Sequence, residues 1–307
     1  MKKIVSLVLT LVLCACACLT FASCGNTADY NVGVCQLMKH ESLDKATQGF
    51  KDALNEAMKE AGKTVHIDVQ EAGESQYCST VINAFTAKKV DLIMGNATPA
   101  LLAAANATKD IPVLGTSVTD YSDTFGGKIP ANVSGTSDAV PFDQQAQMMI
   151  DTLGLKEGDQ VGVVYCLNES NSALQYEAVK KHFEANKITV KAYTFSDTTE
   201  IQTVVTSAAN ESKAIYVPSD NTVADNDSIL ATVCGDKVPV YTSYGGSVCY
   251  ASLAIDYYQL GVETGKMAAE ILLNGKTPAD FEIKTLTPST TFNADLCAKL
   301  GIAVDEK

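Results

Sequence analysis

The same strand–turn–helix–strand pattern occurs twice in this sequence, about 120 residues apart. Residues 90–120 hold an apolar run, a polar turn, a short helical pattern and a second apolar run, and residues 212–241 repeat that order. Short apolar runs bounded by turn residues and separated by a helical pattern are typical of parallel βαβ units. The duplication therefore predicts an α/β fold of two lobes, each a mostly parallel sheet flanked by helices.

Length and hydropathy suit two lobes of ordinary domain size. The chain has 307 residues, of which 46% are hydrophobic, and this is enough for one core in each lobe. Extended segments near residues 134–138, 251–255 and 282–287 are expected to cross between the lobes, which predicts a hinge with three crossings. The predicted lobes are residues 30–136 with 257–281 (lobe 1) and residues 137–256 with 282–307 (lobe 2).

The N-terminus has the features of an export signal. Residues 1–23 combine a basic start, an apolar run and small residues before Cys24, and the apolar run is too short for a membrane-spanning helix. Residues 21–25, Phe-Ala-Ser-Cys-Gly, resemble the lipobox of bacterial lipoproteins, in which the cysteine carries the lipid. We expect lipidation at Cys24, with residues 24–29 as a tether. Processing at Cys18, or ordinary cleavage without a lipid, is the alternative.

Charge limits the partners of this chain. All 23 basic residues are lysines, and the net charge of −13 becomes −15 once Lys2 and Lys3 leave with the signal peptide. A chain this acidic is not expected to bind nucleic acid. Without arginine it also cannot hold a carboxylate through a bidentate guanidinium group, so a helix N-terminus is expected to bind any anionic group instead.

Six cysteines remain after the signal peptide and Cys24. An even number in an exported protein allows three disulfides. Two of the six lie in predicted core strands of different lobes, which favours small buried side chains instead. Their spacing fits no metal site, and no metal is expected. The six are Cys35, Cys78, Cys166, Cys234, Cys249 and Cys297.

Polar residues follow many of the predicted strands at the point where each strand ends. In open parallel sheets, ligands bind beyond the carboxyl ends of the strands, so these residues are candidates for the walls of a ligand cleft. The candidates from lobe 1 are Gln36, His40, Asn96, Thr98, Ser117 and Thr119. The candidates from lobe 2 are Asn168, Glu169, Asn171, Ser172, Ser219, Asp220, Asn221 and Tyr244.

The helix predicted to start at Thr98 offers free N–H groups and the positive end of its dipole to an anion. We expect these amides, with the hydroxyls of Thr98 and Ser117, to bind an α-carboxylate. Asp220, with Asn221 and Glu169, is expected to bind an α-ammonium from the other lobe. Caps of helices are the alternative role for Thr98, Asp220 and Asn221. The candidates for an aromatic side-chain pocket are Tyr77, Tyr121, Tyr244 and Tyr250.

A set of short motifs runs in one order along nearly the whole mature chain. The motifs are Cys35-Gln36-Leu37, Ala97-Thr98-Pro99-Ala100, Val118-Thr119-Asp120, Asn168-Glu169-Ser170-Asn171-Ser172, Val217-Pro218-Ser219-Asp220-Asn221 and Asp256-Tyr257-Tyr258-Gln259-Leu260-Gly261. This ordered set resembles the ABC transporter substrate-binding lipoproteins that include tryptophan- and phenylalanine-binding members. The resemblance implies a periplasmic-binding-protein-like fold, an extracytoplasmic protein anchored to the bacterial cell membrane, permease subunits as partners and an aromatic amino acid as ligand. We expect a monomer without a cofactor.

Catalysis is not expected of this chain. It has three histidines, and no motif for a serine nucleophile, a zinc protease, a phosphate loop or a dinucleotide site occurs. Two alternatives stay open beside aromatic amino acid transport. One is a binding protein for another small polar metabolite or a branched-chain amino acid, and the other is a surface lipoprotein without a transport function.

Overall fold

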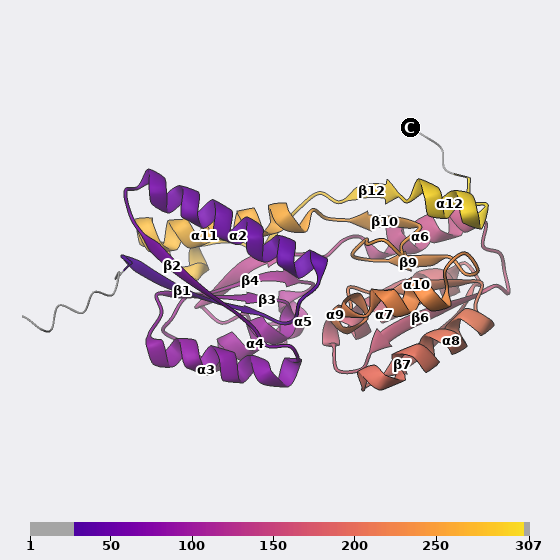
Figure 1. The fold of residues 1–307 in the computed structure, drawn as a ribbon, viewed down its shortest axis with the longest axis horizontal. Helices are drawn as coiled ribbons and strands as arrows, with labels where there is room; N and C mark the ends of the chain where they lie inside the picture. The colour runs from indigo at the N-terminus through magenta and orange to yellow at the C-terminus, as the bar shows by residue number, and fades with distance from the viewer. Residues whose placement is uncertain (1–27, 304–307) are drawn as a thin grey trace, which may run out of the picture.

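The structure is a computed structural model that describes residues 28–303, and it contains two α/β lobes (Figure 1). The predicted signal peptide, the lipidation site Cys24 and the first residues of the tether lie outside the described residues. Each lobe has its own parallel sheet with helices packed on it, so the predicted fold class is confirmed. None of the helices in residues 28–303 has both the length and the apolar character needed to span a membrane.

Lobe 1 is built on a six-stranded parallel sheet in the spatial order β11-β5-β4-β3-β1-β2. Its central strands β3 and β4 are buried throughout, because helices cover both faces of the sheet. The strands are β1 (Tyr30–Gln36), β2 (Val65–Glu71), β3 (Leu92–Asn96), β4 (Val113–Val118), β5 (Val133–Ser137) and β11 (Lys284–Thr285). The helices are α2 (Glu41–Glu60), η1 (Ser75–Tyr77), α3 (Cys78–Lys88), α4 (Thr98–Ala107), α5 (Tyr121–Thr124), α11 (Tyr257–Asn274) and η3 (Pro278–Asp280).

Lobe 2 has a four-stranded parallel sheet in the order β7-β6-β8-β9. The duplicated sequence units form β3–α4–β4 in lobe 1 and β8 to β9 in lobe 2, and in both the two strands are parallel neighbours. The strands are β6 (Gln160–Cys166), β7 (Thr189–Phe195), β8 (Ala214–Val217) and β9 (Val240–Thr242). The helices are α6 (Phe142–Leu153), α7 (Ser170–Ala185), η2 (Thr198–Glu200), α8 (Ile201–Glu211), α9 (Asn221–Asp225), α10 (Asp227–Val233) and α12 (Ala294–Leu300).

The chain crosses between the lobes after β5, after β10 and after β11. Strands β10 (Ala251–Ala254) and β12 (Ser289–Phe292) form an antiparallel pair on the lobe 2 side of the junction. β11 pairs with β5 and so extends the lobe 1 sheet. The predicted lobe 2 segment, residues 282–307, therefore begins too early, since its first strand belongs to lobe 1.

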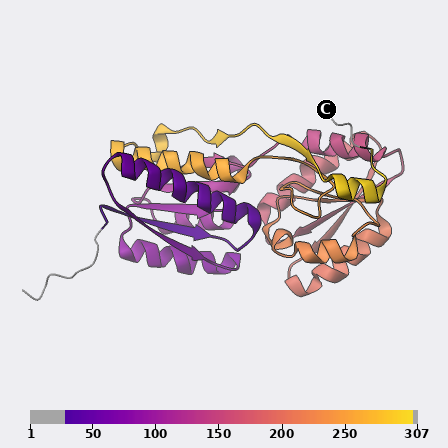
Figure 2. The same ribbon diagram turned by 45° about the horizontal axis from the view of Figure 1, so that its top comes forward.

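Helices α2 and α11 come from opposite ends of the sequence and lie side by side on lobe 1 (Figure 2). Two glycines allow this close approach. A Cβ atom on Gly49 would lie 2.1 Å from the carbonyl oxygen of Tyr258, and one on Gly261 would lie 1.9 Å from that of Ala46. The tight contact fixes the N-termini of both helices, which begin next to the junction between the lobes.

All six cysteines in the described residues are buried and free. The interpretation of these cysteines as small buried side chains is confirmed, and the alternative of three disulfides is wrong. Cys35 in β1 and Cys78 at the start of α3 belong to one apolar cluster of lobe 1. Cys166 in β6 belongs to an apolar cluster of lobe 2, where burial raises the pKa of its thiol.

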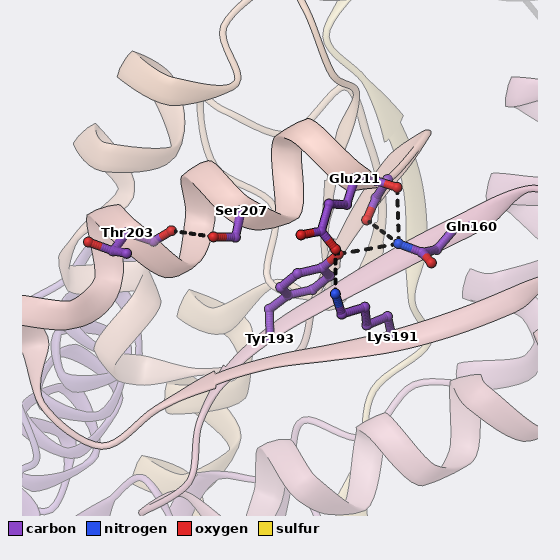
Figure 3. A network of polar contacts seen from close by, with 7 residues as sticks. Gln160, Lys191, Tyr193, Thr203, Ser207 and Glu211 are labelled. Atoms are coloured by element: carbon purple, nitrogen blue, oxygen red, sulfur yellow. Dashed lines mark hydrogen bonds and ion pairs between the residues drawn. The ribbon is translucent and has the colours of Figure 1, made fainter.

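A polar network joins the first residue of β6 to β7 and to the last residue of α8 (Figure 3). The hydroxyl of Tyr193 donates to Glu211 Oε2 at 2.9 Å, and Gln160 Nε2 donates to the Tyr193 hydroxyl at 3.2 Å and to the Glu211 carbonyl at 3.0 Å. Lys191 pairs with the Glu211 carboxylate and lies over the Tyr193 ring. This network is far from the carboxyl ends of the strands, and its groups satisfy one another.

Candidate ligand-binding site

Residues beyond the strand ends of both lobes meet in a deep cavity at the junction. Its walls include Ser117 and Asp138 from lobe 1 and its crossing segment, and Ser219 and Asn221 from lobe 2. The cavity measures about 10 Å³, which is about the space of one water molecule. A wider outer cavity of about 490 Å³ adjoins it, and both are lined by His40, Ser42, Ala224, Tyr244 and Tyr257.

The lobe 1 wall of this cleft has a strained backbone. Ala97 and Ser117 adopt positive φ values of 87° and 55°, which non-glycine residues rarely do and which tend to occur at functional sites. Ala97 is the N-cap of α4 and has no side chain with which to cap it, so Thr98 is not the cap. Helix α4 presses tightly on β3, because a Cβ atom on Gly95 would lie 2.6 Å from the Leu101 nitrogen. The uncapped start of α4 is thus held rigidly at the junction.

Five buried side-chain atoms in the described residues have no hydrogen-bond partner, and all belong to strand ends, helix starts or a crossing segment at the junction. Buried polar atoms in folded proteins are nearly always paired, and each unpaired one costs about 1–3 kcal/mol. Two of the five residues, Ser117 and Asp138, line the deep cavity, where a partner from outside the chain could complete them. The five atoms are Asn96 Oδ1, Ser117 Oγ, Asp138 Oδ1, Asn171 Oδ1 and Ser172 Oγ.

The two lobe 2 carboxylates at the junction are fully used by the chain itself. Asp220 is completely buried, and its oxygens accept hydrogen bonds from the backbone N–H groups of Val223 (2.9 Å) and Cys166 (2.8 Å). Glu169 accepts hydrogen bonds from the backbone and side-chain N–H groups of Asn221, at 2.9 and 2.7 Å. Burial and the neighbouring Glu169 raise the pKa of Asp220, against the effect of the two amides. Both carboxylates therefore anchor the start of α9.

Asp138, which the sequence analysis did not select, is the buried carboxylate with a free oxygen. It follows β5 in the first crossing segment and is 7% exposed. Its Oδ2 accepts a hydrogen bond from the Tyr257 hydroxyl at 3.0 Å, while Oδ1 has no partner. Burial raises the pKa of Asp138, and the nearby hydroxyls of Thr119 and Tyr257 act in the opposite direction. Its position inside the predicted crossing segment 134–138 was the signal that could have identified it.

Two hydrogen bonds join the lobes directly across the cleft. His40 Nε2 and Asn221 Oδ1 are 3.1 Å apart, and Gln175 Nε2 donates to Thr119 Oγ1 at 3.3 Å. Burial lowers the pKa of His40, which favours the neutral imidazole. The lobes are therefore shut on each other. Gln175 lies within α7 rather than at a strand end, so the strand-end rule did not select it.

The other predicted polar residues connect neighbouring strand ends. Asn96 donates to the Leu43 carbonyl at 2.8 Å, and Asn171 donates to the Ser219 carbonyl at 2.8 Å. The Ser219 hydroxyl lies 3.2 Å from that of Ser243. These bonds hold the loops of each lobe in place around the cavity, while Asn96 Oδ1 and Asn171 Oδ1 remain unpaired.

Eight of the fourteen predicted residues line neither the deep nor the outer cavity, and they are Gln36, Asn96, Thr98, Thr119, Asn168, Glu169, Asn171 and Ser172. Gln36 is buried behind the deep cavity, where its side chain donates to the Met38 carbonyl at 2.9 Å and accepts from the Thr47 hydroxyl at 2.6 Å. Asn168 is exposed and donates to the Ser196 carbonyl at 3.2 Å. Neither side chain lines the deep or the outer cavity.

Of the four tyrosines predicted for an aromatic pocket, one lines the cavities and three do not. Tyr121 and Tyr250 are buried inside lobe 1 and lobe 2, and Tyr77 is 51% exposed on the surface. Tyr244 lines both cavities, as predicted for a pocket residue. Tyr257, at the start of α11, also lines both and was not predicted.

A third cavity, of about 500 Å³, opens between the lobes near η1 and η2. Its described lining contains four carboxylates and no lysine, so its potential is negative. The four are Glu74, Glu169, Asp197 and Asp225. Within residues 28–303, His, Cys, Asp and Glu side chains do not come together in a group of three or more that could hold a metal ion.

A cleft between two parallel α/β lobes, with buried polar atoms that lack partners, defines a solute-binding protein. The family model of the ABC transporter substrate binding proteins matches residues 31–307, so the chain belongs to that family. The family resemblance deduced from the ordered motifs is confirmed.

Relatives with known names or structures cover most of the chain. A tyrosine-binding protein from Clostridioides difficile (strain R20291) is 35% identical over 265 residues, which are 83% of this chain and 76% of that protein. An ABC domain from Streptococcus pneumoniae solved in complex with L-Trp has a TM-score of 0.81 and 32% identity, and the match covers 90% of this chain and 96% of that one.

A third relative differs in its state. The ligand-free, open structure of a substrate binding protein with adhesive properties from Clostridium difficile is 31% identical, and the match covers 90% of this chain and 96% of that one. Its TM-score is 0.67, against 0.81 for the complex with L-Trp, although identity and coverage are nearly the same. The better agreement with the complex accords with the lobes of this chain being shut.

Proposed function

We propose that this protein is an extracytoplasmic binding protein of an ABC importer that captures an aromatic amino acid between its lobes. The observation that carries the proposal is the unpaired Oδ1 of Asp138, which shares the deep cavity with the unpaired hydroxyl of Ser117. A carboxylate and a hydroxyl in one buried cavity suit the ammonium and carboxylate groups of a zwitterion. The named tyrosine-binding relative and the L-Trp complex support an aromatic side chain.

The carboxylate of the ligand binds at the start of α4. Ala97 gives this helix no side-chain cap, and Pro99 has no N–H group, so the N–H groups of Thr98 and Ala100 are the donors proposed for an anion. The Ser117 hydroxyl, which has no partner in the chain, adds a further donor. Because the sequence contains no arginine, backbone amides and hydroxyls replace the guanidinium group in this role.

The ammonium group of the ligand binds Asp138 rather than Asp220. The Asp220 carboxylate already accepts two backbone N–H groups and the Glu169 carboxylate is similarly occupied, whereas Asp138 has one oxygen free. The side-chain oxygen of Asn221, which bonds to His40 in the shut state, is a second acceptor at the same cavity.

Binding requires the lobes to separate and close again. Pockets for small molecules measure about 300–1,000 Å³, so the deep cavity of about 10 Å³ must open to admit a ligand. The ligand then contacts both lobes and stabilises a closed state in which the deep cavity is larger than the present volume of about 10 Å³. The carboxylates in the wall of the outer cavity, Glu41, Asp227 and Asp256, disfavour a ligand with an acidic side chain.

Delivery follows from the family. ABC transporter substrate-binding proteins act outside the cytoplasm, and a lipid on Cys24 would tether the lobes to the bacterial membrane beside the permease subunits. We propose that the protein acts there as a monomer, without a cofactor and without catalysis.

Isothermal calorimetry tests the proposed ligand class. The mature chain, freed of copurified ligand by mild denaturation and refolding, is titrated with Tyr, Trp, Phe, Leu and Glu. We expect binding of at least one aromatic amino acid to be ~100-fold or more tighter than binding of Leu or Glu. Mass spectrometry of the protein as purified should find the same amino acid. Tighter binding of Leu, or no binding of any of the five, would contradict the proposal.

Adhesion is a second candidate function, because one relative is described as a substrate binding protein with adhesive properties. Adhesion uses exposed surface, so it would not depend on the buried cavity. Attachment of cells that display the full chain should then be unchanged by Asp138→Asn, while amino acid binding is lost.

A further inference from the structure

The outer cavity is next to the proposed site for the main-chain groups of an amino acid. It joins the deep cavity through a shared wall that includes His40, Tyr244 and Tyr257. A ligand whose ammonium and carboxylate groups occupy the deep cavity must project its side chain past these rings. At about 490 Å³, the outer cavity has room for an aromatic ring.

Asp227, at the start of α10, places a carboxylate in the wall of this cavity. The Tyr244 hydroxyl donates to Asp227 Oδ1 at 2.7 Å, and within residues 28–303 this is the one hydrogen bond that reaches the carboxylate. Gly246 leaves the second oxygen uncovered, because a Cβ atom there would lie 3.1 Å from Asp227 Oδ2. Burial, with a smaller contribution from Glu41, raises the pKa of Asp227 to about 6.

The other acidic groups that face this cavity already have partners. Glu41 pairs with Lys45 at 2.6 Å on the exposed side of α2. Asp256 caps α11 by accepting from the Gln259 backbone N–H at 3.1 Å. Each of the three carboxylates thus has one partner, but Glu41 and Asp256 are exposed whereas Asp227 is half-buried, so Asp227 is the one that a ring in the outer cavity would most readily shield from water.

We propose that Asp227 is a specificity-determining residue, whose carboxylate accepts a hydrogen bond from a polar donor at the distal end of the ligand's aromatic ring. The site then prefers a phenol such as tyrosine to phenylalanine. This inference rests on the proposed function, since it places the main-chain groups of an amino acid in the deep cavity. A ring without a donor would cover the Asp227 carboxylate and remove its water without replacing it, and the chain would reject that ligand.

Calorimetry with Tyr and Phe on matched variants tests this. We expect the wild type to bind Tyr about 10- to 100-fold more tightly than Phe. Asp227→Ala should reduce this ratio to within about threefold, mainly through weaker binding of Tyr. Glu41→Gln, which removes a negative charge from the same cavity wall, should leave the ratio unchanged.

The pH dependence of the ratio separates a hydrogen bond to Asp227 from a change in packing. Protonation of a carboxyl with a pKa of about 6 weakens it as an acceptor, so the Tyr/Phe ratio of the wild type should fall between about pH 7.5 and pH 5. In Asp227→Asn, which keeps an acceptor but cannot ionise, the ratio should not vary with pH. Thermal melts of each variant check folding.

The possible failures can be told apart. If no aromatic amino acid binds the wild type, the proposed function is wrong and the inference goes with it. If Tyr and Phe bind equally well, or if Asp227→Ala retains the wild-type ratio, the inference alone is overturned. Loss of the ratio in Glu41→Gln would likewise overturn it, because the net charge of the cavity would then set the preference.

Discussion

Two kinds of buried carboxylate lie at the junction between the lobes, and they differ in how many donors surround them. Asp220 and Glu169 in lobe 2 each accept at least two hydrogen bonds from the chain, including backbone N–H groups. Asp138, in the crossing segment after β5, accepts one from Tyr257 and keeps one oxygen without a partner. Burial and charge alone therefore do not mark the ligand-binding group, whereas the number of satisfied oxygens does.

The same difference has an energetic consequence. Backbone N–H groups offset part of the loss of water around Asp220 and Glu169, although the pKa of Asp220 stays raised, and the two carboxylates stabilise the fold by pairing these N–H groups. The free oxygen of Asp138 has lost water without such compensation, so this residue destabilises the ligand-free shut state. A buried polar group that destabilises the ligand-free fold is expected at a binding site, because the ligand supplies its missing hydrogen-bond partner.

The largest expected effect is the loss of ligand binding in Asp138→Asn. Removing the charge leaves the ligand's ammonium desolvated without a counter-charge, which should weaken the affinity for the confirmed amino acid ~100- to 1,000-fold. The ligand-free variant should melt at the same temperature as the wild type or higher, because a buried charge is gone. Calorimetry and thermal melts measure the two quantities.

Asp143→Asn is the matched control for this experiment. It removes the same charge five residues further along, from an exposed position in the first turn of α6, and should leave the affinity unchanged. If Asp138→Asn binds within about threefold of the wild type, the contrast between the two kinds of carboxylate has no functional meaning.

Asp220→Ala should have the opposite effects to Asp138→Asn: it should reduce the stability of the protein and largely keep its affinity for the ligand. It leaves the N–H groups of Val223 and Cys166 without partners, which should lower the free energy of unfolding by about 2–4 kcal/mol. The fraction that remains folded should bind the ligand within about fivefold of the wild type, as measured by calorimetry well below the melting temperature. A loss of affinity as large as that of Asp138→Asn, with stability intact, would return the ammonium site to Asp220.

The fold was predictable because it depends on local patterns that the sequence repeats. Apolar runs followed by polar turns located the strands of both lobes, and free cysteines followed from their positions in core strands such as β1 and β6. The rule of strand ends also selected Ser117 and Asn221, which line the deep cavity. The rule could not show which of these residues bind a ligand. It gives the position of each residue at a strand end but not the hydrogen-bond donors that surround its side chain.

The unpredicted part of the site depends on contacts between distant segments. Asp138 and Tyr257 are 119 residues apart, and their hydrogen bond exists because α11 packs on α2 in lobe 1. The roles of Asp220 and Glu169 depend on the amides of α9 and β6, which converge only in the folded lobe. No periodicity or spacing in the sequence encodes such a convergence.

The pH dependence of ligand affinity is a further test of the role of Asp138. Burial raises the pKa of Asp138 in the ligand-free protein, so the carboxyl gains a proton as the pH falls through that raised value and loses its attraction for an ammonium group. Affinity should therefore fall towards low pH, by up to about tenfold per pH unit. The stability of the ligand-free protein should change in the opposite direction, because a raised pKa contributes stability at low pH that is lost as the pH rises through it. Both trends should be weaker in Asp138→Asn, and equal slopes in the two proteins would assign them to another group.

Ser117→Ala tests the uncharged hydroxyl that lines the same deep cavity as Asp138. Its hydroxyl has no acceptor or donor in the chain, so removal should leave the stability of the ligand-free protein unchanged or slightly higher. The affinity should fall about three- to tenfold, because one neutral hydrogen bond to the ligand's carboxylate is lost. Ser134→Ala, whose hydroxyl donates to the Phe281 carbonyl at 3.2 Å inside lobe 1, is the control and should show the opposite pattern.

The smallest effect on stability is expected in the polar network of Figure 3. Its groups have hydrogen-bond partners, as Asp220 does, but they are open to water. Lys191 and Glu211 are about half exposed, with 47% and 48% of their side-chain surfaces accessible, so water competes for both partners of the ion pair. Lys191→Met should therefore leave ligand affinity unchanged and shift the melting temperature less than Asp220→Ala does. If the shift equalled that of Asp220→Ala, satisfied hydrogen bonds would stabilise this fold regardless of burial. The difference between Asp138 and the pair Asp220 and Glu169 would then depend only on how many hydrogen bonds each carboxylate accepts. How deeply each carboxylate is buried would not contribute to it.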